Sequence, residues 1–112
     1  MAITKITLRE RVAEHLRISS PDRELDAATA ARIDASIADA RAELMERGLC
    51  WWGEDAIPNS VVFALTLICS AQAAAKTGRM GQGYEDGDGE GRIRLAALKP
   101  TADVMPVMAE YF

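Results

Sequence analysis

The residue pattern with the clearest chemical meaning in this chain runs from Asp86 to Ala97. Asp86, Asp88 and Glu90 occupy positions one, three and five of a twelve-residue calcium loop, where carboxylate oxygens surround the ion. Position twelve of that template requires a bidentate glutamate, but Ala97 stands there. Without those two oxygens the coordination shell is incomplete. We therefore expect a solvated acidic segment and no metal site.

The glycines between Gly78 and Gly83 superficially resemble a phosphate-binding loop. Such a loop follows a strand and leads into a helix through Gly-Lys-Ser or Gly-Lys-Thr. Here the preceding segment is predicted to be helical, and no such triplet follows. The pattern therefore does not predict nucleotide binding.

Histidine and cysteine supply no recognisable catalytic or zinc-binding set. His15 is the single histidine, and Cys50 and Cys69 lie 19 positions apart without a CxxC pair. A structural zinc site needs four nitrogen or sulfur ligands, and no nucleophile is placed beside His15 by local spacing. We expect two reduced, buried cysteines, a histidine on a helix surface, no cofactor and no enzymatic activity.

Charged residues predict solvated surfaces and argue against binding through phosphates. Asp39 and Glu43 share one helix face but lack the Glu-x-x-His pattern of a di-iron bundle. The chain has 17 acidic and 13 basic residues, for a net charge of −4. It also lacks the basic stretch that neutralises nucleic-acid phosphates.

Apolar periodicity predicts two amphipathic helices in the first half of the chain. The first is expected over 8–18, opened by a capping box of Thr7 and Glu10. The second is expected over 26–47, ended by Gly48. Its buried side is predicted to consist of Ala28, Ala31, Ile33, Ile37, Ala40, Leu44 and Met45.

A third helix is predicted from Pro58, at its first position, to Lys76. It is apolar nearly all round, including Phe63, so we expect it to be the central and most buried helix. Its longest apolar run, 61–69, is too short to span a bilayer, and no membrane association is expected.

The remainder of the chain divides into a loop, a short helix and a tail. Residues 78–91 contain six glycines and four acidic residues, a composition that favours a flexible loop. A short fourth helix is predicted over 92–98. The predicted fold is all-α: a small antiparallel bundle of three main helices plus a short fourth helix. Residues 1–98 form one domain, and 99–112 form an extended C-terminal docking tail.

Two groups of residues are predicted to bind partners. Trp51 and Trp52 either close a thin, alanine-rich core or anchor an interface, where tryptophan is enriched. The tail has six large apolar side chains in its last nine residues, which are unfavourable in water. The tail either packs on its own subunit or docks on a neighbouring protein as an extended strand or hook, and we predict docking on a neighbour. These tail residues are Val104, Met105, Val107, Met108, Tyr111 and Phe112.

The order of segments over residues 4–78 resembles the phage head-to-tail adaptor family, also called head–tail connector or packaged-DNA-stabilisation proteins. The resemblance lies in the segment Thr4-Lys5-Ile6-Thr7-Leu8 and the Ser-Ser-Pro turn. It continues through the long helix that ends in Glu46-Arg47-Gly48-Leu49-Cys50-Trp51-Trp52. Asp55-Ala56-Ile57-Pro58-Asn59 and an apolar helix follow. One departure is that the chain has a Gly/Asp-rich loop and a short segment where relatives continue with a longer fourth helix.

This resemblance implies a structural virion protein in the neck, at the head–tail junction, made in the host cytoplasm. Such proteins form a ring, typically of twelve subunits, between the portal protein and a tail or stopper protein. The ring extends the channel for double-stranded DNA, which passes without sequence-specific contact, and helps to retain the packaged genome. In the family the C-terminal segment commonly reaches into the portal.

A second class of protein is compatible with a small helical chain. It is a regulatory or interaction protein of the antitoxin or helix-turn-helix type. Its recognition helix should be basic, and no predicted helix here is basic. A light-scattering mass and a test of duplex-DNA binding would separate the two classes.

Overall fold

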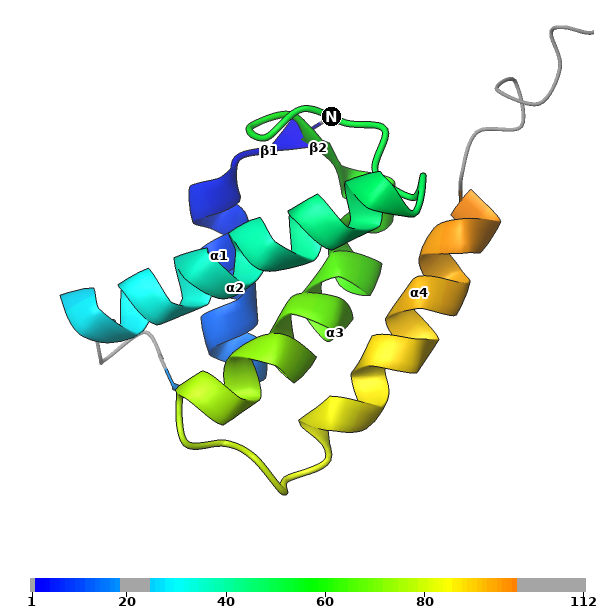
Figure 1. Cartoon of the computed structure of the whole chain (residues 1–112). Coiled ribbons are helices and arrows are strands. Elements are labelled where there is room, and N and C mark those ends of the chain that lie inside the picture. The colour runs from blue at the N-terminus through cyan, green and yellow to red at the C-terminus, as the bar shows by residue number, and fades with distance from the viewer. Residues whose placement is uncertain (1, 19–24, 99–112) are drawn as a thin grey trace, which may run out of the picture.

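The structure is a computed structural model that describes residues 2–18 and 25–98, and over this part the chain is predominantly all-α, as predicted (Figure 1). The described residues contain four α-helices, one turn of 3₁₀ helix and two very short strands. Their bounds are β1 Ala2–Ile3, α1 Lys5–His15, α2 Ala27–Glu46, β2 Ile57–Pro58, α3 Asn59–Lys76, η1 Tyr84–Asp86 and α4 Gly87–Leu98.

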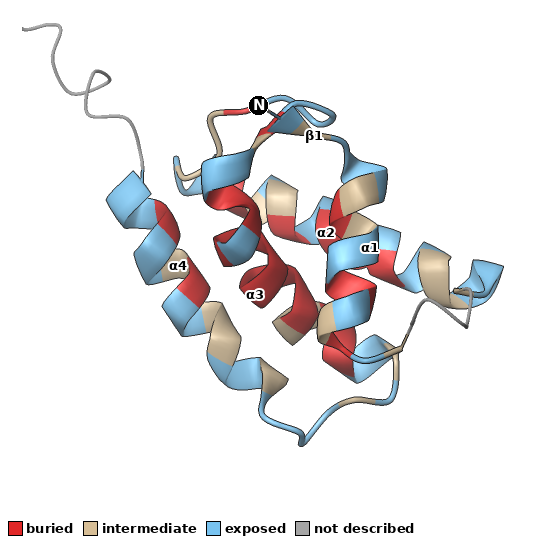
Figure 2. Ribbon diagram, turned by 180° about the vertical axis from the view of Figure 1, so that it is seen from behind, coloured by how far each residue is buried: buried red, intermediate tan, exposed pale blue. Residues whose placement is uncertain are grey.

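Helix α3 is the central element, as its sequence predicts. It packs against α1 and α2 on one side and against α4 on the other (Figures 1 and 2). Eleven of its residues are buried. By length and composition alone, this 18-residue helix could cross a membrane. The shorter apolar run over 61–69 did not predict this. However, 61% of the helix is buried inside the fold, so its apolar side chains form the core.

The first helix begins one turn earlier than predicted. Thr4 caps it, because its side-chain oxygen accepts a hydrogen bond from the backbone N–H of Thr7. The predicted capping box of Thr7 and Glu10 is therefore wrong by one turn. Helix α1 ends at His15, and Arg17 adopts a positive φ of 59°. The predicted turn at Ser19-Ser20-Pro21 lies outside the described residues.

The buried side of α2 is confirmed at its centre and wrong towards its ends. Ile33, Ile37, Ala40 and Leu44 are buried, whereas Ala28, Ala31 and Met45 are exposed. The first turns of α2 extend past the other described helices (Figure 1), and Ala28 and Ala31 are exposed there. Gly48 has the positive φ, 72°, that the predicted helix end requires.

A short antiparallel pairing joins the two ends of the first half of the chain. Ala2 pairs with Pro58 and Ile3 with Ile57, a contact that the sequence did not predict. The pairing places the beginnings of α1 and α3 at the same end of the molecule (Figure 1). Pro58 is the N-cap of α3 and not its first residue.

The prediction of a loop over 78–91 is wrong for its second half. Residues 84–86 form a 3₁₀ turn, and α4 begins at Gly87. Side-chain pairs four residues apart stabilise its first turns, with Asp88 joined to Arg92 and Glu90 to Arg94. Gly91 permits this packing, because a Cβ there would lie 2.7 Å from the backbone oxygen of Ala64. Contacts with α3 thus override the low helix propensity of glycine.

Candidate functional site

The two tryptophans lie in the loop between α2 and β2 and pack against each other. Their rings meet edge to face, with centroids 4.9 Å apart and an interplanar angle of 84°. Trp52 is buried and belongs to the core, whereas Trp51 is half-buried. Trp52 therefore takes the core-closing role, and part of the Trp51 ring remains available to a partner.

A cavity of about 140 Å³, which we call the Trp52 cavity, lies beside this loop. Its wall is formed by α1, α2, α3 and the loop that precedes β2, with an apolar interior and charged groups at several points. The lining residues are Lys5, Leu8, Asp34, Ile37, Ala38, Arg41, Trp52, Glu54, Ile57, Leu65 and Cys69. Sequence reasoning did not find this cavity, because its walls come from segments that are up to 64 residues apart.

Arg41 is the cation of the cavity wall that lacks an anionic partner among the described residues. Its Nη2 donates a hydrogen bond to the carbonyl oxygen of Trp52, at 3.2 Å. Its Nε is buried and has no hydrogen-bond partner in the described part of the chain. A buried donor without a partner is costly, so this position favours a group that brings an acceptor.

The two acidic residues of the cavity wall are already paired with other cations. Asp34 accepts from Arg9 at 2.8 Å, and Glu54 lies 3.1 Å from the ammonium group of Lys5. The hydrogen bond with Glu54 raises the pKa of Lys5 above its ordinary value. The charges of Lys5, Asp34 and Glu54 are therefore balanced without Arg41.

Neither cysteine is disulfide-bonded, as expected. Cys69 is buried in the cavity wall, and this burial raises the pKa of its thiol to about 12. A thiol in that state is a poor nucleophile at neutral pH. Cys50 is half-buried, which is less burial than predicted, and its Sγ lies 3.7 Å from the carbonyl oxygen of Trp52.

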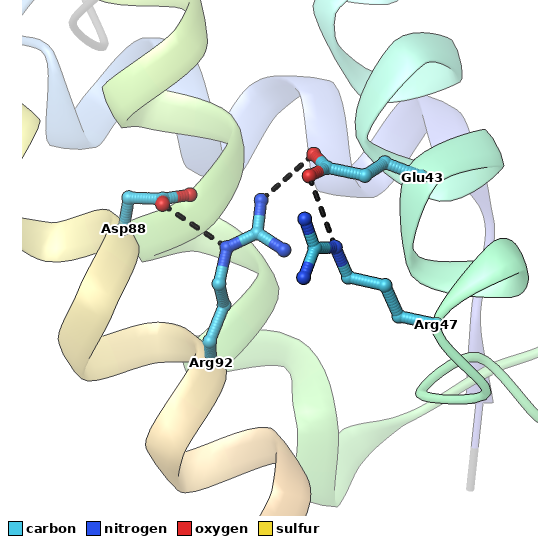
Figure 3. Close-up of polar contacts among 4 residues, drawn as sticks. All are labelled: Glu43, Arg47, Asp88 and Arg92. Atoms are coloured by element: carbon cyan, nitrogen blue, oxygen red, sulfur yellow. Dashed lines mark hydrogen bonds and ion pairs between the residues drawn. The ribbon is translucent and has the colours of Figure 1, made fainter.

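A cluster of four charged residues joins α4 to α2 (Figure 3). Arg92 contacts Glu43 through Nη2 at 2.8 Å and Asp88 through Nε at 3.0 Å. Arg47 contacts the other oxygen of Glu43 at 3.3 Å. The hydrogen bond from Arg92 lowers the pKa of Glu43 below its ordinary value. The expected solvated face around Glu43 is thus a contact between helices.

Glu43→Gln is expected to make the protein less sensitive to acid. A carboxylate whose pKa is lowered by folding contributes its stabilisation above its ordinary value of 4.5, and this is lost as the pH falls through the lowered pKa. We expect the free energy of unfolding in urea to fall less between about pH 6 and about pH 3 in the variant than in the parent.

Glu46→Gln is the matched control for this measurement. Glu46 lies on the same helix, is exposed, and makes no ion pair among the described residues. Its replacement should leave the parent's acid sensitivity in place. An acid-induced loss of stability in Glu43→Gln as large as in the parent would contradict the role assigned to Arg92 and Glu43.

His15 is half-buried at the end of α1, so it is less exposed than predicted. Its ring meets Tyr84 edge to face, with centroids 5.5 Å apart. This contact joins the 3₁₀ turn to α1. It gives the histidine a packing partner from a segment 69 residues away in the sequence.

The acidic residues of the calcium-like pattern serve other purposes. Asp88 and Glu90 pair with arginines of α4. Glu85, which directly precedes the pattern, accepts a hydrogen bond from the backbone N–H of Gly81. That hydrogen bond lowers the pKa of Glu85. Within residues 2–18 and 25–98, no group of three or more His, Cys, Asp or Glu side chains is arranged to hold a metal ion.

The predicted docking residues of the tail lie outside the described residues. They are Val104, Met105, Val107, Met108, Tyr111 and Phe112. The helix that leads into the tail is described, and it ends beside the beginning of α3 (Figures 1 and 2). Comparison of the chain with protein-family models, with curated proteins and with solved structures finds no match.

Proposed function

We propose that this chain is a structural virion protein, a head-to-tail adaptor that forms a ring between the portal and the tail. The observation that carries the proposal is that α4, the helix that precedes the apolar tail sequence, keeps two large apolar side chains exposed. Ile93 is 74% exposed and Leu98 is 42% exposed. Large apolar side chains on a protein surface are typical of contact sites when they gather together.

Phe63 adds a third exposed apolar side chain next to α4. It is 54% exposed, although its position in α3 predicted burial. The guanidinium group of Arg94 lies 5.0 Å from the centre of its ring, a cation–π contact. A partner that covers this face would bury the ring without disturbing the core, because Phe63 projects away from it.

The charge distribution is compatible with a channel through which DNA slides. The chain is acidic overall, with a net charge of −4, and like charges discourage adhesion of the DNA backbone. Six basic side chains of the described part are already in ion pairs, namely Lys5, Arg9, Arg47, Lys76, Arg92 and Arg94. Pairing reduces the positive charge available to phosphates.

The proposed assembly follows from the family resemblance. It is a ring, typically of twelve subunits, in the virion neck, in contact with the portal protein and with a tail or stopper protein. Double-stranded DNA passes through it without sequence-specific contact. The tail, residues 99–112, is the proposed docking element for the portal.

The test is co-assembly of the purified full chain with portal rings of the same phage, imaged by electron microscopy. The full chain should add a layer of density to the portal ring. The chain truncated after Pro100 should add none, because it lacks the apolar docking residues. The matched control changes the polar tail residues Thr101 and Asp103 to alanine and should still bind.

Two results would contradict the adaptor proposal. One is a truncated chain that decorates portal rings as well as the full chain does. The other is a stable monomer that binds duplex DNA, which would favour the helix-turn-helix type of regulator. Light scattering and a duplex-DNA gel shift distinguish this second result from a failed portal preparation.

A further inference from the structure

The Trp52 cavity has an apolar floor and a charged rim. Its floor is formed by buried side chains, namely Leu8, Ile37, Trp52, Ile57, Leu65 and Cys69. The rim is formed by the exposed residues Lys5, Asp34, Ala38 and Glu54, and the remaining lining residue, Arg41, is half-buried. A molecule that fits this cavity therefore has an apolar body and a polar group at one end.

The floor has the size and composition of a site for one aromatic ring. The cavity volume is about 140 Å³, and an apolar cavity of about 150 Å³ in another protein admits benzene. An empty cavity forgoes dispersion contacts with the atoms of its wall, so a ring that enters it is stabilised. The indole of Trp52 adds an aromatic surface, on which a second ring packs favourably edge to face or offset.

The rim leaves one positive charge without an anionic partner among the described residues. Asp34 and Glu54 are each paired with another cation, as described above. Asp55 lies outside the lining, where its carboxylate accepts a hydrogen bond from the backbone N–H of Lys5. This position is the N-terminus of α1, which favours a negative charge. The charge that a ligand can neutralise is therefore that of Arg41, and a single negative charge suffices.

We propose that the Trp52 cavity binds a small aromatic monocarboxylate of the size of benzoate, with its ring on the apolar floor and its carboxylate at Arg41. The Nη2 of Arg41 donates to the carbonyl oxygen of Trp52 at 3.2 Å, while its buried Nε has no partner among the described residues. A carboxylate supplies the missing acceptor, and hydrogen bonds between charged groups are the stronger kind. This binding goes beyond the proposed adaptor function and does not depend on it.

The surroundings of the cavity favour a free acid over the aromatic side chain of a partner protein. A protein interface surrounds its buried anchors with further apolar contacts. Among the described residues, none of the large apolar side chains that are exposed lines this cavity. Its rim consists instead of charged side chains and Ala38, a rim that suits a small ligand.

Methyl NMR spectroscopy of the full chain, titrated with benzoate, tests the proposal directly. The methyl resonances of Leu8, Ile37 and Leu65 should shift and saturate, with a dissociation constant on the order of 1 mM or tighter. The exposed methyls of Ile93 should not shift. Benzyl alcohol, which has the same ring without the charge, should bind about tenfold more weakly. The absence of saturable shifts, or equal affinity for the two compounds, would overturn the proposal.

Arg41→Met tests the carboxylate contact, because it removes the charge and keeps an unbranched apolar side chain. The variant should bind benzoate about tenfold more weakly than the parent, yet bind benzyl alcohol as the parent does. Arg32→Met is the matched control, since Arg32 is exposed on the same helix and does not line the cavity. A preference for benzoate that survives in Arg41→Met, or an equal loss of both compounds, would contradict the assigned contact.

Ala38→Leu tests the location of the ring, because a larger side chain at the rim obstructs the cavity. Binding of both compounds should weaken about tenfold or more. Ala42→Leu is the matched control, since Ala42 is also exposed on α2 but does not line the cavity. Unchanged binding in Ala38→Leu would place the ligand elsewhere on the protein.

N-acetylphenylalanine amide separates a free acid from the side chain of a polypeptide. It presents an aromatic side chain on a neutral backbone, and we expect it to bind at least about tenfold more weakly than benzoate. Binding as tight as that of benzoate would overturn the proposal in favour of a partner protein. All of these measurements use the isolated chain, so they do not depend on whether it binds a portal.

Discussion

Gly91→Ala is expected to lower the free energy of unfolding by about 1–3 kcal/mol, the usual cost of overfilling a packed contact. Gly91 is buried where α4 crosses α3. A Cβ there would lie 2.7 Å from the backbone oxygen of Ala64 and 2.7 Å from Cγ1 of Ile68. The backbone oxygen cannot rotate away, so α4 must shift outward. Urea unfolding measures the effect.

Gly89→Ala is the matched control, two residues away in the same helix. A Cβ at Gly89 would meet nothing within 4 Å. Alanine should therefore stabilise the helix by about 0.5–1 kcal/mol, because glycine loses more backbone entropy on folding. The two variants should change stability in opposite directions. Stabilisation by both would show that α4 does not pack closely on α3 through Gly91.

Ile68→Ala should destabilise the protein by about 2–5 kcal/mol, through lost burial and the cavity that remains. Ile68 is fully buried in α3, at the contact with Gly91. A domain of this size has a total stability on the order of 5–15 kcal/mol. The variant should therefore be close to unfolding at moderate temperature, as circular dichroism during heating would show.

Ile93→Ala provides the control for removal of the same side chain from the surface. Ile93 is 74% exposed on α4, and surface substitutions usually change stability by less than about 0.5 kcal/mol. Its loss should matter only where a partner covers α4. A large destabilisation by Ile93→Ala would place this side chain in a packed environment that the structure does not contain.

Periodicity in the sequence predicted the core well where a helix lies across its neighbours. Ile33, Ile37 and Leu44 are buried as predicted, and α3 is the central helix. The same rule failed for Met45 and Phe63, which are 52% and 54% exposed. A periodic pattern specifies which face of a helix is apolar, but the length over which a neighbour covers that face depends on how the helices cross.

The candidate site was predictable only in part. Trp51 and Trp52 were predictable from the sequence, because tryptophan buries a large apolar area and this chain has few other aromatic residues. The role of Arg41 was not predicted, since its unpartnered Nε depends on the positions of Trp52, Asp34 and Glu54. The spacing of Asp88 to Arg92 and of Glu90 to Arg94 was an available signal for the helix over 87–98.

The sequence by itself determined the all-α class and the order of the helices, because these depend on side chains three and four residues apart. Only the tertiary structure decided that the acidic, glycine-rich segment from Gly87 onward becomes a helix. It also decided that Arg92 contacts Glu43 and that a cavity of about 140 Å³ lies beside Trp52. These features arise where distant segments approach closely, and a glycine favours a close approach only when the opposing backbone is there to meet it.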